Sequence, residues 1–586
     1  SKSRPDISCI ARAILRQSSN GQLREAVSSL EQLTRKGIRL PCDTLAFLIK
    51  KCADWKSLKL GKWVHLHLKV TGLKRPNTLL ANHLIYMYSE CRDHIGARKV
   101  FDKMVHKNLY SWNHMLSGYA KMGMVKPTKK LFDKMPEKDV VSWNTMVFGY
   151  ANSGLCAEAL DYYRGLRRAG IGCNDYTFTG LLTICVKLKE IQLTRQAHGQ
   201  VLVVGLLSNV VVSCSVLDAY AKCGEMGFAS SLFEEMKVKD VLAWTTMVSG
   251  FAQCGNMKTA TEFFHLMPAK NPVSWTSLIA GYARQGQGHR ALQLFARMMA
   301  FRIRPDQFTF SSCLCACASI ASLKHGKQVH AYMTRMNFRP NAIVVSSLID
   351  MYAKCGCLDA GRLVFDATSV KKDVVLWNTM LSALAQHGRG EEAIRMVDEM
   401  ICSGVKPNRI TLIILLHACS HSGLVQEGLR VFESMTLSHG VVPDQEHYAC
   451  LVDILGRAGD FDNLINQLQK LPCEPNEQIL SALLGVCAIH GNMELGKTAA
   501  EQLMKLEPQS PAAYVLLSSI HATLGKWDSA EQFRELMEKR QVKKEQGISW
   551  IEQQNNLHTF TVSEQLAGHH EEEEEEEEDV PSSPID

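Results

Sequence analysis

The chain repeats one short sequence theme, and this repetition constrains its fold more than any other feature. Residues 111–120 read Ser-Trp-Asn-His-Met-Leu-Ser-Gly-Tyr-Ala, and residues 142–151 read Ser-Trp-Asn-Thr-Met-Val-Phe-Gly-Tyr-Ala. The theme returns at Trp244, Trp275 and Trp377, so its successive tryptophans are separated by 31, 101, 31 and 102 residues. Such self-similarity is typical of an array of one supersecondary unit, in which each copy buries its apolar face against its neighbours.

Each copy of the theme predicts a pair of helices. Apolar residues recur at the i, i+3, i+4 and i+7 positions that share one helix face, as in Trp112, Met115, Leu116 and Tyr119. A second amphipathic segment follows a short break and ends at Pro136, which cannot continue a helix. The sequence therefore predicts an all-α fold built from helix-turn-helix repeats.

Fourteen repeats follow one another over residues 7–476, with lengths near 35 and near 31 residues in rotation. They are Ile7–Pro41, Cys42–Asn77, Thr78–Asn108, Leu109–Asp139, Val140–Asn174, Asp175–Asn209, Val210–Asp240, Val241–Asn271, Pro272–Asp306, Gln307–Asn341, Ala342–Asp373, Val374–Asn408, Arg409–Asp444 and Gln445–Asn476.

Charge is distributed unevenly along the chain. The formal net charge is +7, but residues 567–586 hold 10 acidic side chains and no Lys or Arg, so the other 566 residues carry +17. A basic body with an acidic end indicates a polyanionic partner such as nucleic acid. No apolar run approaches the roughly 18 residues of a membrane span, so no membrane partner is expected. The 20 cysteines lie within helical patterns and are expected to be reduced thiols that pack as small apolar residues.

Four motifs, at residues 131–139, 142–146, 326–330 and 351–356, carry a family resemblance. They read LFDKMPEKD, SWNTM, GKQVH and MYAKCG, and with the rotating repeat lengths they resemble plant pentatricopeptide repeat proteins of the PLS subclass. The resemblance implies a right-handed superhelical α-solenoid. A tetratricopeptide array has a similar period but lacks this length rotation.

The resemblance also implies a division of the chain. Residues 1–6 would be the remnant of a leader, since the basic, Ser-bearing start is similar to the end of an organelle transit peptide. A boundary chosen in cloning explains the missing initiator Met equally well. Residues 7–476 would be repeats, 477–544 two E motifs, 545–566 a truncated E-plus-like box, and 567–586 a disordered acidic tail. In the box, Gly547, Ser549 and Trp550 are the residues expected to dock a protein partner.

The resemblance places base-reading residues at the fifth and last positions of each repeat. One such repeat reads one RNA base with two or three side chains. The pairs are Asn82/Asn108, Asn113/Asp139, Asn144/Asn174, Thr179/Asn209, Thr245/Asn271, Thr276/Asp306, Ser311/Asn341, Ser346/Asp373 and Asn378/Asn408. By the family's code, repeats Thr78–Asn408 read, from 5′ to 3′, pyrimidine, U, pyrimidine, A, unassigned, A, G, A, G, pyrimidine. Five repeats stay unassigned, because Ala11, Ala46, Cys214, Ile413 and Ala449 lack the usual hydrogen-bonding groups.

A simpler interpretation is that these polar residues are helix caps and turn formers. It accounts for the terminal Asn and Asp. It accounts poorly for the fifth position, which falls inside the first turns of a helix.

No catalytic or metal-binding constellation is found, so neither an enzyme nor a cofactor is expected. A zinc deaminase needs His-x-Glu followed by Pro-Cys-x-x-Cys. Here His-x-Glu occurs only where the Glu run begins, at His569-His570-Glu571 and the residue after it, and no Cys follows Cys487. The Cys-x-Cys spacings near Cys315 do not match a zinc knuckle.

The resemblance therefore implies an adaptor that binds single-stranded organellar RNA as a monomer and selects cytidines for C-to-U editing. Its partners would be a deaminase-bearing pentatricopeptide repeat protein and small editing factors, both acting in trans. Mitochondrion is expected, with chloroplast as the alternative. The alternatives in function are a splicing, stability or translation factor, and a tetratricopeptide-like protein scaffold.

Overall fold

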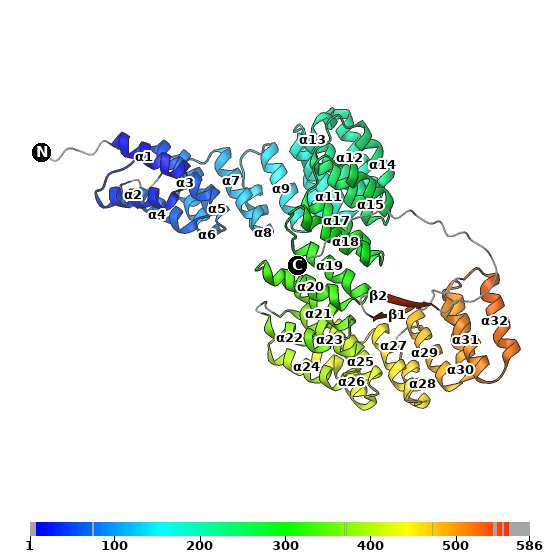
Figure 1. The fold of residues 1–586 in the computed structure, drawn as a ribbon. Helices are drawn as coiled ribbons and strands as arrows, with labels where there is room; N and C mark the ends of the chain where they lie inside the picture. The colour runs from blue at the N-terminus through cyan, green and yellow to red at the C-terminus, as the bar shows by residue number, and fades with distance from the viewer. Residues whose placement is uncertain are drawn as a thin grey trace. The chain divides into compact units, whose positions relative to one another are not determined.

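The computed structural model describes residues 7–20, 22–72, 76–368, 370, 372–471, 473–542, 548–553 and 556–561 (Figure 1). The chain divides into two compact parts, residues 1–285 with 293–304, and residues 286–292 with 305–586. The division falls within helix α18, Gly288–Ala300.

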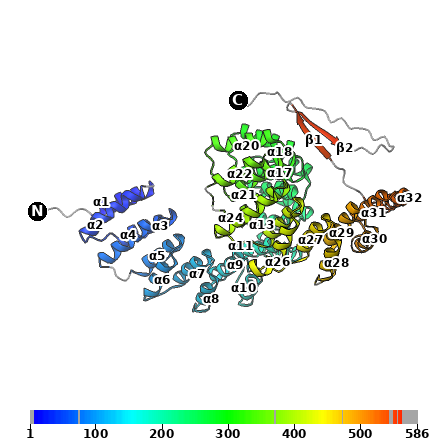
Figure 2. The same cartoon turned by 90° about the horizontal axis from the view of Figure 1, so that it is seen from below.

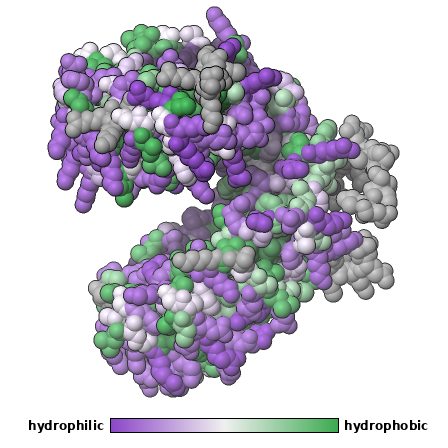
Figure 3. All heavy atoms as spheres, turned by 90° about the vertical axis from the view of Figure 1, so that its left-hand side faces the viewer, coloured by the Kyte–Doolittle hydropathy of each residue, from purple (hydrophilic) through white to green (hydrophobic). Residues whose placement is uncertain are grey.

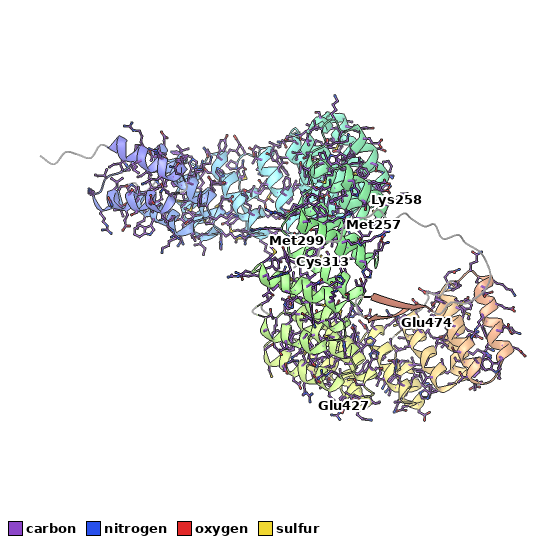
Figure 4. All side chains as sticks on the ribbon, viewed as in Figure 1. Met257, Lys258, Met299, Cys313, Glu427 and Glu474 are labelled. Atoms are coloured by element: carbon purple, nitrogen blue, oxygen red, sulfur yellow. The ribbon has the colours of Figure 1, made fainter. Side chains whose placement is uncertain are left out.

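The described residues of the first part form paired helices. The first helix of each pair is α1 Ile7–Ser19, α3 Cys42–Asp54, α5 Thr78–Glu90, α7 Leu109–Lys121, α9 Val140–Asn152, α11 Asp175–Leu188, α13 Val210–Lys222, α15 Val241–Gln253 or α17 Pro272–Arg284. The second is α2 Leu23–Arg35, α4 Leu58–Val70, α6 His94–Lys103, α8 Val125–Asp133, α10 Cys156–Arg168, α12 Ile191–Val204, α14 Met226–Glu235 or α16 Met257–Leu266, and a short 3-10 helix, η1, spans Leu206–Ser208. Figure 4 labels Met257 and Lys258 at the start of α16.

The second part continues the same pattern. Its first helices are α19 Gln307–Ser319, α21 Ala342–Lys354, α23 Val374–Gln386, α25 Arg409–His421, α27 Gln445–Arg457, α29 Glu477–His490 and α31 Pro511–Thr523. Its second helices are α20 Leu323–Arg335, α22 Leu358–Ala367, α24 Gly390–Cys402, α26 Val425–His439, α28 Phe461–Gln469, α30 Met493–Leu506 and α32 Trp527–Lys539. The prediction of an all-α solenoid of paired helices is confirmed.

Local sequence explains where the helices begin and turn. The last residue of a repeat is the N-cap of the next first helix, as where the Asn174 side chain accepts a hydrogen bond from the Thr177 backbone N–H at 3.0 Å. The two helices of a repeat are joined by a tight turn. In the Ala342–Asp373 repeat, Gly356 takes a φ of 77°, which a residue with a Cβ adopts only with strain.

The helices form two layers with an apolar core between them. In Figure 2, α5, α7 and α9 lie in one layer, and α6, α8 and α10 lie in the other. One continuous cluster of buried side chains runs from Ala11 to Met247 in the first part. Buried cysteines such as Cys313, labelled in Figure 4, belong to the packed interior, and the described cysteines form no disulfide. The repetition thus produces a stacked core of the kind expected for a solenoid.

The GKQVH and MYAKCG motifs meet across neighbouring repeats. A Cβ at Gly326 would collide with the Met351 side chain, so glycine permits the close approach of α20 to α21. His330 Nδ1 lies 2.8 Å from the Tyr352 hydroxyl, and the same hydrogen bond joins His65 to Tyr88 and His198 to Tyr220 at 2.8 and 3.0 Å. These histidines therefore link adjacent repeats.

A two-stranded antiparallel hairpin follows the helices. Strand β1, Ile548–Gln553, pairs with β2, Asn556–Thr561, and this hairpin is not predicted from the sequence. Ser549 and Trp550 lie in β1, opposite Phe560 and Thr559. Gly547, together with residues 1–6 and 562–586, lies outside the described residues.

The described residues contain neither a membrane-spanning helix nor a cluster of metal-binding side chains. No helix there is both long and apolar enough to cross a bilayer. No group of three or more His, Cys, Asp or Glu residues there is placed to hold a metal ion.

Candidate nucleic-acid interface

Apart from Pro41, the last residue of every predicted repeat caps the following helix through its side-chain oxygen Oδ1. Asp139 Oδ1 accepts from the Ser142 N–H at 2.9 Å, and Asn271 Oδ1 accepts from the Ser274 N–H at 2.8 Å. The same capping contact is made by Asn108, Asn174, Asn209, Asp306, Asn341, Asp373 and Asn408. The capping interpretation is therefore correct for these nine residues. Their second side-chain atom takes no part in the cap, although in two of them it contacts the fifth residue: Asp139 Oδ2 lies 3.3 Å from Asn113 Nδ2, and Asn271 Nδ2 donates to Thr245 at 3.0 Å.

The fifth and last residues of a repeat lie together, although 26 to 30 residues separate them in the chain. In four pairs the amide of the fifth residue donates to the last residue, and in one the last residue donates to the fifth. The distances are 3.2 Å for Asn82–Asn108, 3.1 Å for Asn113–Asp139, 3.1 Å for Asn144–Asn174, 3.4 Å for Asn378–Asn408 and 3.0 Å for Asn271–Thr245.

Two of the other fifth residues make different contacts. Thr179 donates to the Asp175 carbonyl at 2.8 Å, and Ser311 shares a 2.7 Å hydrogen bond with Ser347 of the next repeat. Thr276 and Ser346 are half-buried at the same helical position of α17 and α21. Direct hydrogen bonds thus join the fifth and last residues of these five predicted pairs.

A set of apolar residues that the sequence reading missed follows the same register. The second residue of eleven consecutive repeats is a large apolar side chain with between 48% and 71% of its surface exposed. We call this set the second-position series: Leu79, Tyr110, Val141, Tyr176, Val211, Leu242, Val273, Phe308, Ile343, Val375 and Ile410. In the Gln445–Asn476 repeat the position is Glu446. The available signal was an apolar residue recurring where helical periodicity predicts a solvent-facing one.

Members of the second-position series lie beside a fifth and a last residue in one groove of the first part. The groove has a volume of about 560 Å³ and is lined by Lys121, Val141, Asn144, Asn174 and Tyr176, among others. It therefore combines two apolar surfaces, a pair of amides and a cation. Figure 3 shows hydrophobic side chains scattered over a mainly hydrophilic surface.

Basic side chains recur in the last turn of the first helices. They are Lys121, Lys187, Lys222, Arg284, Lys354 and Arg457. Lys121 is 56% exposed and pairs with Glu90, whereas Lys354 is 46% exposed and lies 3.0 Å from Asp350. Cations at this regular spacing suit a partner with regularly spaced negative charges.

Comparisons with known proteins assign this architecture. The PPR repeat family matches residues 138–187, 270–319 and 372–421, and the PPR repeat matches residues 81–109, 110–140, 211–241, 242–271, 343–367 and 410–438. Pentatricopeptide repeat-containing protein At2g21090 of Arabidopsis thaliana is 63% identical over 562 residues, which cover 96% of this chain and 94% of that protein.

The chain belongs to the pentatricopeptide repeat family. An E motif matches residues 490–552, over the region predicted to hold two such motifs. The Arabidopsis thaliana relatives include the mitochondrial At2g03880, 32% identical over 92% of this chain and 75% of its own length. They also include the chloroplastic CRR2, 32% identical over 92% of this chain and 73% of its own length.

Solved structures show the same fold. The maize pentatricopeptide repeat protein PPR10 superposes with a TM-score of 0.53 at 17% identity, over 92% of this chain and 85% of that one. The structure of PPR10 in complex with an 18-nt psaJ RNA element gives a TM-score of 0.56, at the same identity and coverage. Family membership agrees with the expectation that the chain is not an enzyme in its own right.

Proposed function

We propose that this pentatricopeptide repeat protein binds single-stranded RNA and selects its sequence through the fifth and last residues of its repeats. The observation that supports this most is the direct contact of those two side chains, in which Oδ1 of the last residue is committed to the helix cap. The pair then presents one remaining group from each residue to a base.

The chemistry of the last residue sorts bases by their ring nitrogen. Once Oδ1 caps a helix, Asp offers Oδ2 as an acceptor, whereas Asn offers Nδ2 as a donor. U and G carry an N–H on the Watson–Crick ring nitrogen, and C and A carry a bare nitrogen there. Asp139 and Asp306 therefore suit U or G, and Asn174 and Asn271 suit C or A.

The chemistry of the fifth residue selects within each of these two classes. Asn113 uses one Nδ2 proton on Asp139 and keeps the other, so it remains a donor, which suits a pyrimidine carbonyl. Thr245 donates to the Val241 carbonyl at 2.6 Å and accepts from Asn271, so it keeps one lone pair, which suits a purine amino group. Asn/Asp then favours U, Asn/Asn a pyrimidine, Thr/Asn A and Thr/Asp G.

Affinity would come from surfaces that do not depend on the base. Stacking of a base on an aromatic side chain contributes about 1–3 kcal/mol, and the second-position series offers an apolar contact in each of eleven repeats. Lys121 and its counterparts would contact phosphates, which makes binding weaken as salt rises. The RNA footprint would therefore be the eleven repeats from Thr78–Asn108 to Arg409–Asp444.

The finer assignment is a PLS-subclass protein of the E or E-plus type that directs C-to-U editing in an organelle. The E motif at residues 490–552 favours this role over splicing, stability or translation. A deaminase-bearing relative and small editing factors would act in trans, with contacts from the E motifs and the box that contains Gly547, Ser549 and Trp550. The mitochondrion is the proposed compartment, and both mitochondrial and chloroplastic relatives exist.

The test is binding of the purified chain to 5′-CUCANAGAGC-3′, with each assigned letter changed in turn. The proposal requires loss of affinity at the assigned letters and strong salt dependence. A chain that binds none of these RNAs would instead fit the protein-scaffold alternative. Sequencing organellar transcripts from plants that lack the protein then tests the editing role, since a specific cytidine must stay unconverted.

A further inference from the structure

Two repeats that resist assignment from sequence end in Asp yet have no Asn, Ser or Thr at the fifth position. They are Val210–Asp240, with Cys214, and Arg409–Asp444, with Ile413. Both have a member of the second-position series, Val211 and Ile410 respectively. The structure separates them by what their carboxylates contact.

Asp240 keeps one carboxylate oxygen available. Its Oδ1 accepts from the Ala243 N–H at 2.8 Å and from the Cys214 thiol at 3.3 Å. Its Oδ2 has no hydrogen-bond partner among the residues that the structure describes, and the side chain is half-buried. Cys214 thus occupies the place that Asn113 holds against Asp139.

The Cys214 thiol has nothing to offer a base. It is only 2% exposed, and burial, reinforced by the bond to Asp240, raises its pKa to about 12. It therefore stays protonated, and its single proton is directed at Asp240. Of the fifth and last residues of this repeat, only Asp240 can therefore discriminate between bases.

Space for a base exists beside Cys214, the partner of Asp240. A groove of about 300 Å³ is lined by Cys214, Asp218, Leu242 and Thr246, among others. Leu242 is 59% exposed, and Val186 of the preceding repeat also lines the groove, so apolar surface from two repeats borders it. The Asp218 carboxylate is a second acceptor in the same groove.

Asp444 has neither of its oxygens available. Its Oδ1 lies 2.7 Å from His447 Nδ1 and accepts from the Glu446 N–H at 3.1 Å, and its Oδ2 is bound by the Arg409 guanidinium. Arg409 also pairs with Glu446 at 2.9 Å. This carboxylate is committed to neighbouring protein groups on both sides.

We infer that the Val210–Asp240 repeat accepts either keto base, G or U, through Asp240 Oδ2, and that the Arg409–Asp444 repeat does not read its base. This inference rests on the proposed RNA-binding function. G and U share an N–H on the ring nitrogen, so an acceptor opposite that atom admits both and rejects A and C. Without a hydrogen-bonding fifth residue, nothing then separates G from U.

The test uses the full chain and the RNA 5′-CUCANAGAGCN-3′, in which the fifth and eleventh letters are varied separately. RNAs with G or U as the fifth letter should bind with equal affinity. RNAs with A or C there should bind at least about ten-fold more weakly, because they lose a hydrogen bond to a charged group. Asp240→Asn should reverse this preference toward A and C. Cys214→Asn should narrow it to U, and Cys214→Thr should narrow it to G. Equal affinity for all four letters, or an unchanged preference in Asp240→Asn, would overturn the inference.

The matched control is Asp444→Asn, for which affinity is measured with each of the four bases as the eleventh letter of the RNA. All four letters should bind alike there, both before and after the substitution. A preference that this substitution reverses would overturn the claim that Asp444 is sequestered. If the affinity of the unmodified chain did not depend on the second and seventh letters of the RNA, the proposed function itself would be contradicted. Those letters face the independent pairs Asn113/Asp139 and Thr276/Asp306.

Discussion

Replacing Asp139 by Asn should change which base one repeat prefers while leaving the fold intact. Asp139 Oδ1 caps α9 through the Ser142 N–H and lies 3.1 Å from Asn113 Nδ2. Asn and Asp are about equally good N-caps, so the introduced amide keeps both contacts through its own Oδ1. The substitution changes the other atom from an acceptor oxygen to a donor nitrogen, and it gives up the longer contact of 3.3 Å between Asp139 Oδ2 and Asn113 Nδ2.

The magnitude follows from that single atom. A hydrogen bond to a charged group contributes about 1.5–3 kcal/mol, which corresponds to about a ten- to hundred-fold change in affinity. In Asp139→Asn, the affinity for RNA with U as its second letter should fall by this factor relative to the affinity for RNA with C there. The melting temperature of Asp139→Asn should stay close to that of the unmodified chain, because the helix cap persists.

The assay is fluorescence anisotropy with labelled 5′-CUCAUAGAGC-3′ and its second-letter C variant, accompanied by thermal denaturation. Asp139→Ala is the contrasting variant, since it removes the cap at a cost of about 1 kcal/mol and weakens binding to both RNAs. If Asp139→Asn folds normally and still prefers U to the same degree, the assignment of base choice to the uncapped atom is refuted.

Four further predictions concern other parts of the same account. Asp306→Asn should shift the seventh letter from G toward A in the same anisotropy assay, and an unchanged G preference would contradict the code. Tyr176→Ser should weaken binding by about 1–3 kcal/mol whichever base it faces, whereas Val203→Ser, at a residue 89% exposed on α12, should leave affinity unchanged. Lys121→Gln and Lys354→Gln should each reduce the slope of log affinity against log salt by about 0.7, and unaltered slopes would exclude phosphate contacts. Burial, with smaller effects from Lys69 and Lys103, lowers the pKa of His65 from 6.5 to about 4. The contribution of the neutral imidazole to folding stability should therefore be complete above pH 6.5 and decrease as the pH falls toward 4. Melting temperatures measured across this range should show the decrease, and His65→Gln should show a smaller one.

The repeat pattern was sufficient to predict the paired-helix solenoid. Asn174 and Asp139 are each the last residue of a repeat in the sequence, and in the structure they are the N-caps of α11 and α9. Repeat boundaries and helix starts therefore coincide. That coincidence arises because the same side chain satisfies a local hydrogen-bonding need in every copy.

Two features of the site could not be read from the pattern. The exposure of Tyr110 and Tyr176 depends on which face neighbouring repeats cover, and a single amphipathic helix does not specify this. The different contacts of Asp240 and Asp444 depend on Arg409, which approaches Asp444 from 35 residues away in the chain, and on His447. The β1–β2 hairpin was missed because its strands are short and no repeat precedes them as a template.

The most direct test of the central claim is selection of RNAs bound by the purified chain from a random pool, followed by sequencing. The account predicts enrichment of one ordered motif, pyrimidine-U-pyrimidine-A-G/U-A-G-A-G-pyrimidine from 5′ to 3′. Binding with no enriched motif, or a motif whose letters do not follow the order of the repeats, would contradict it.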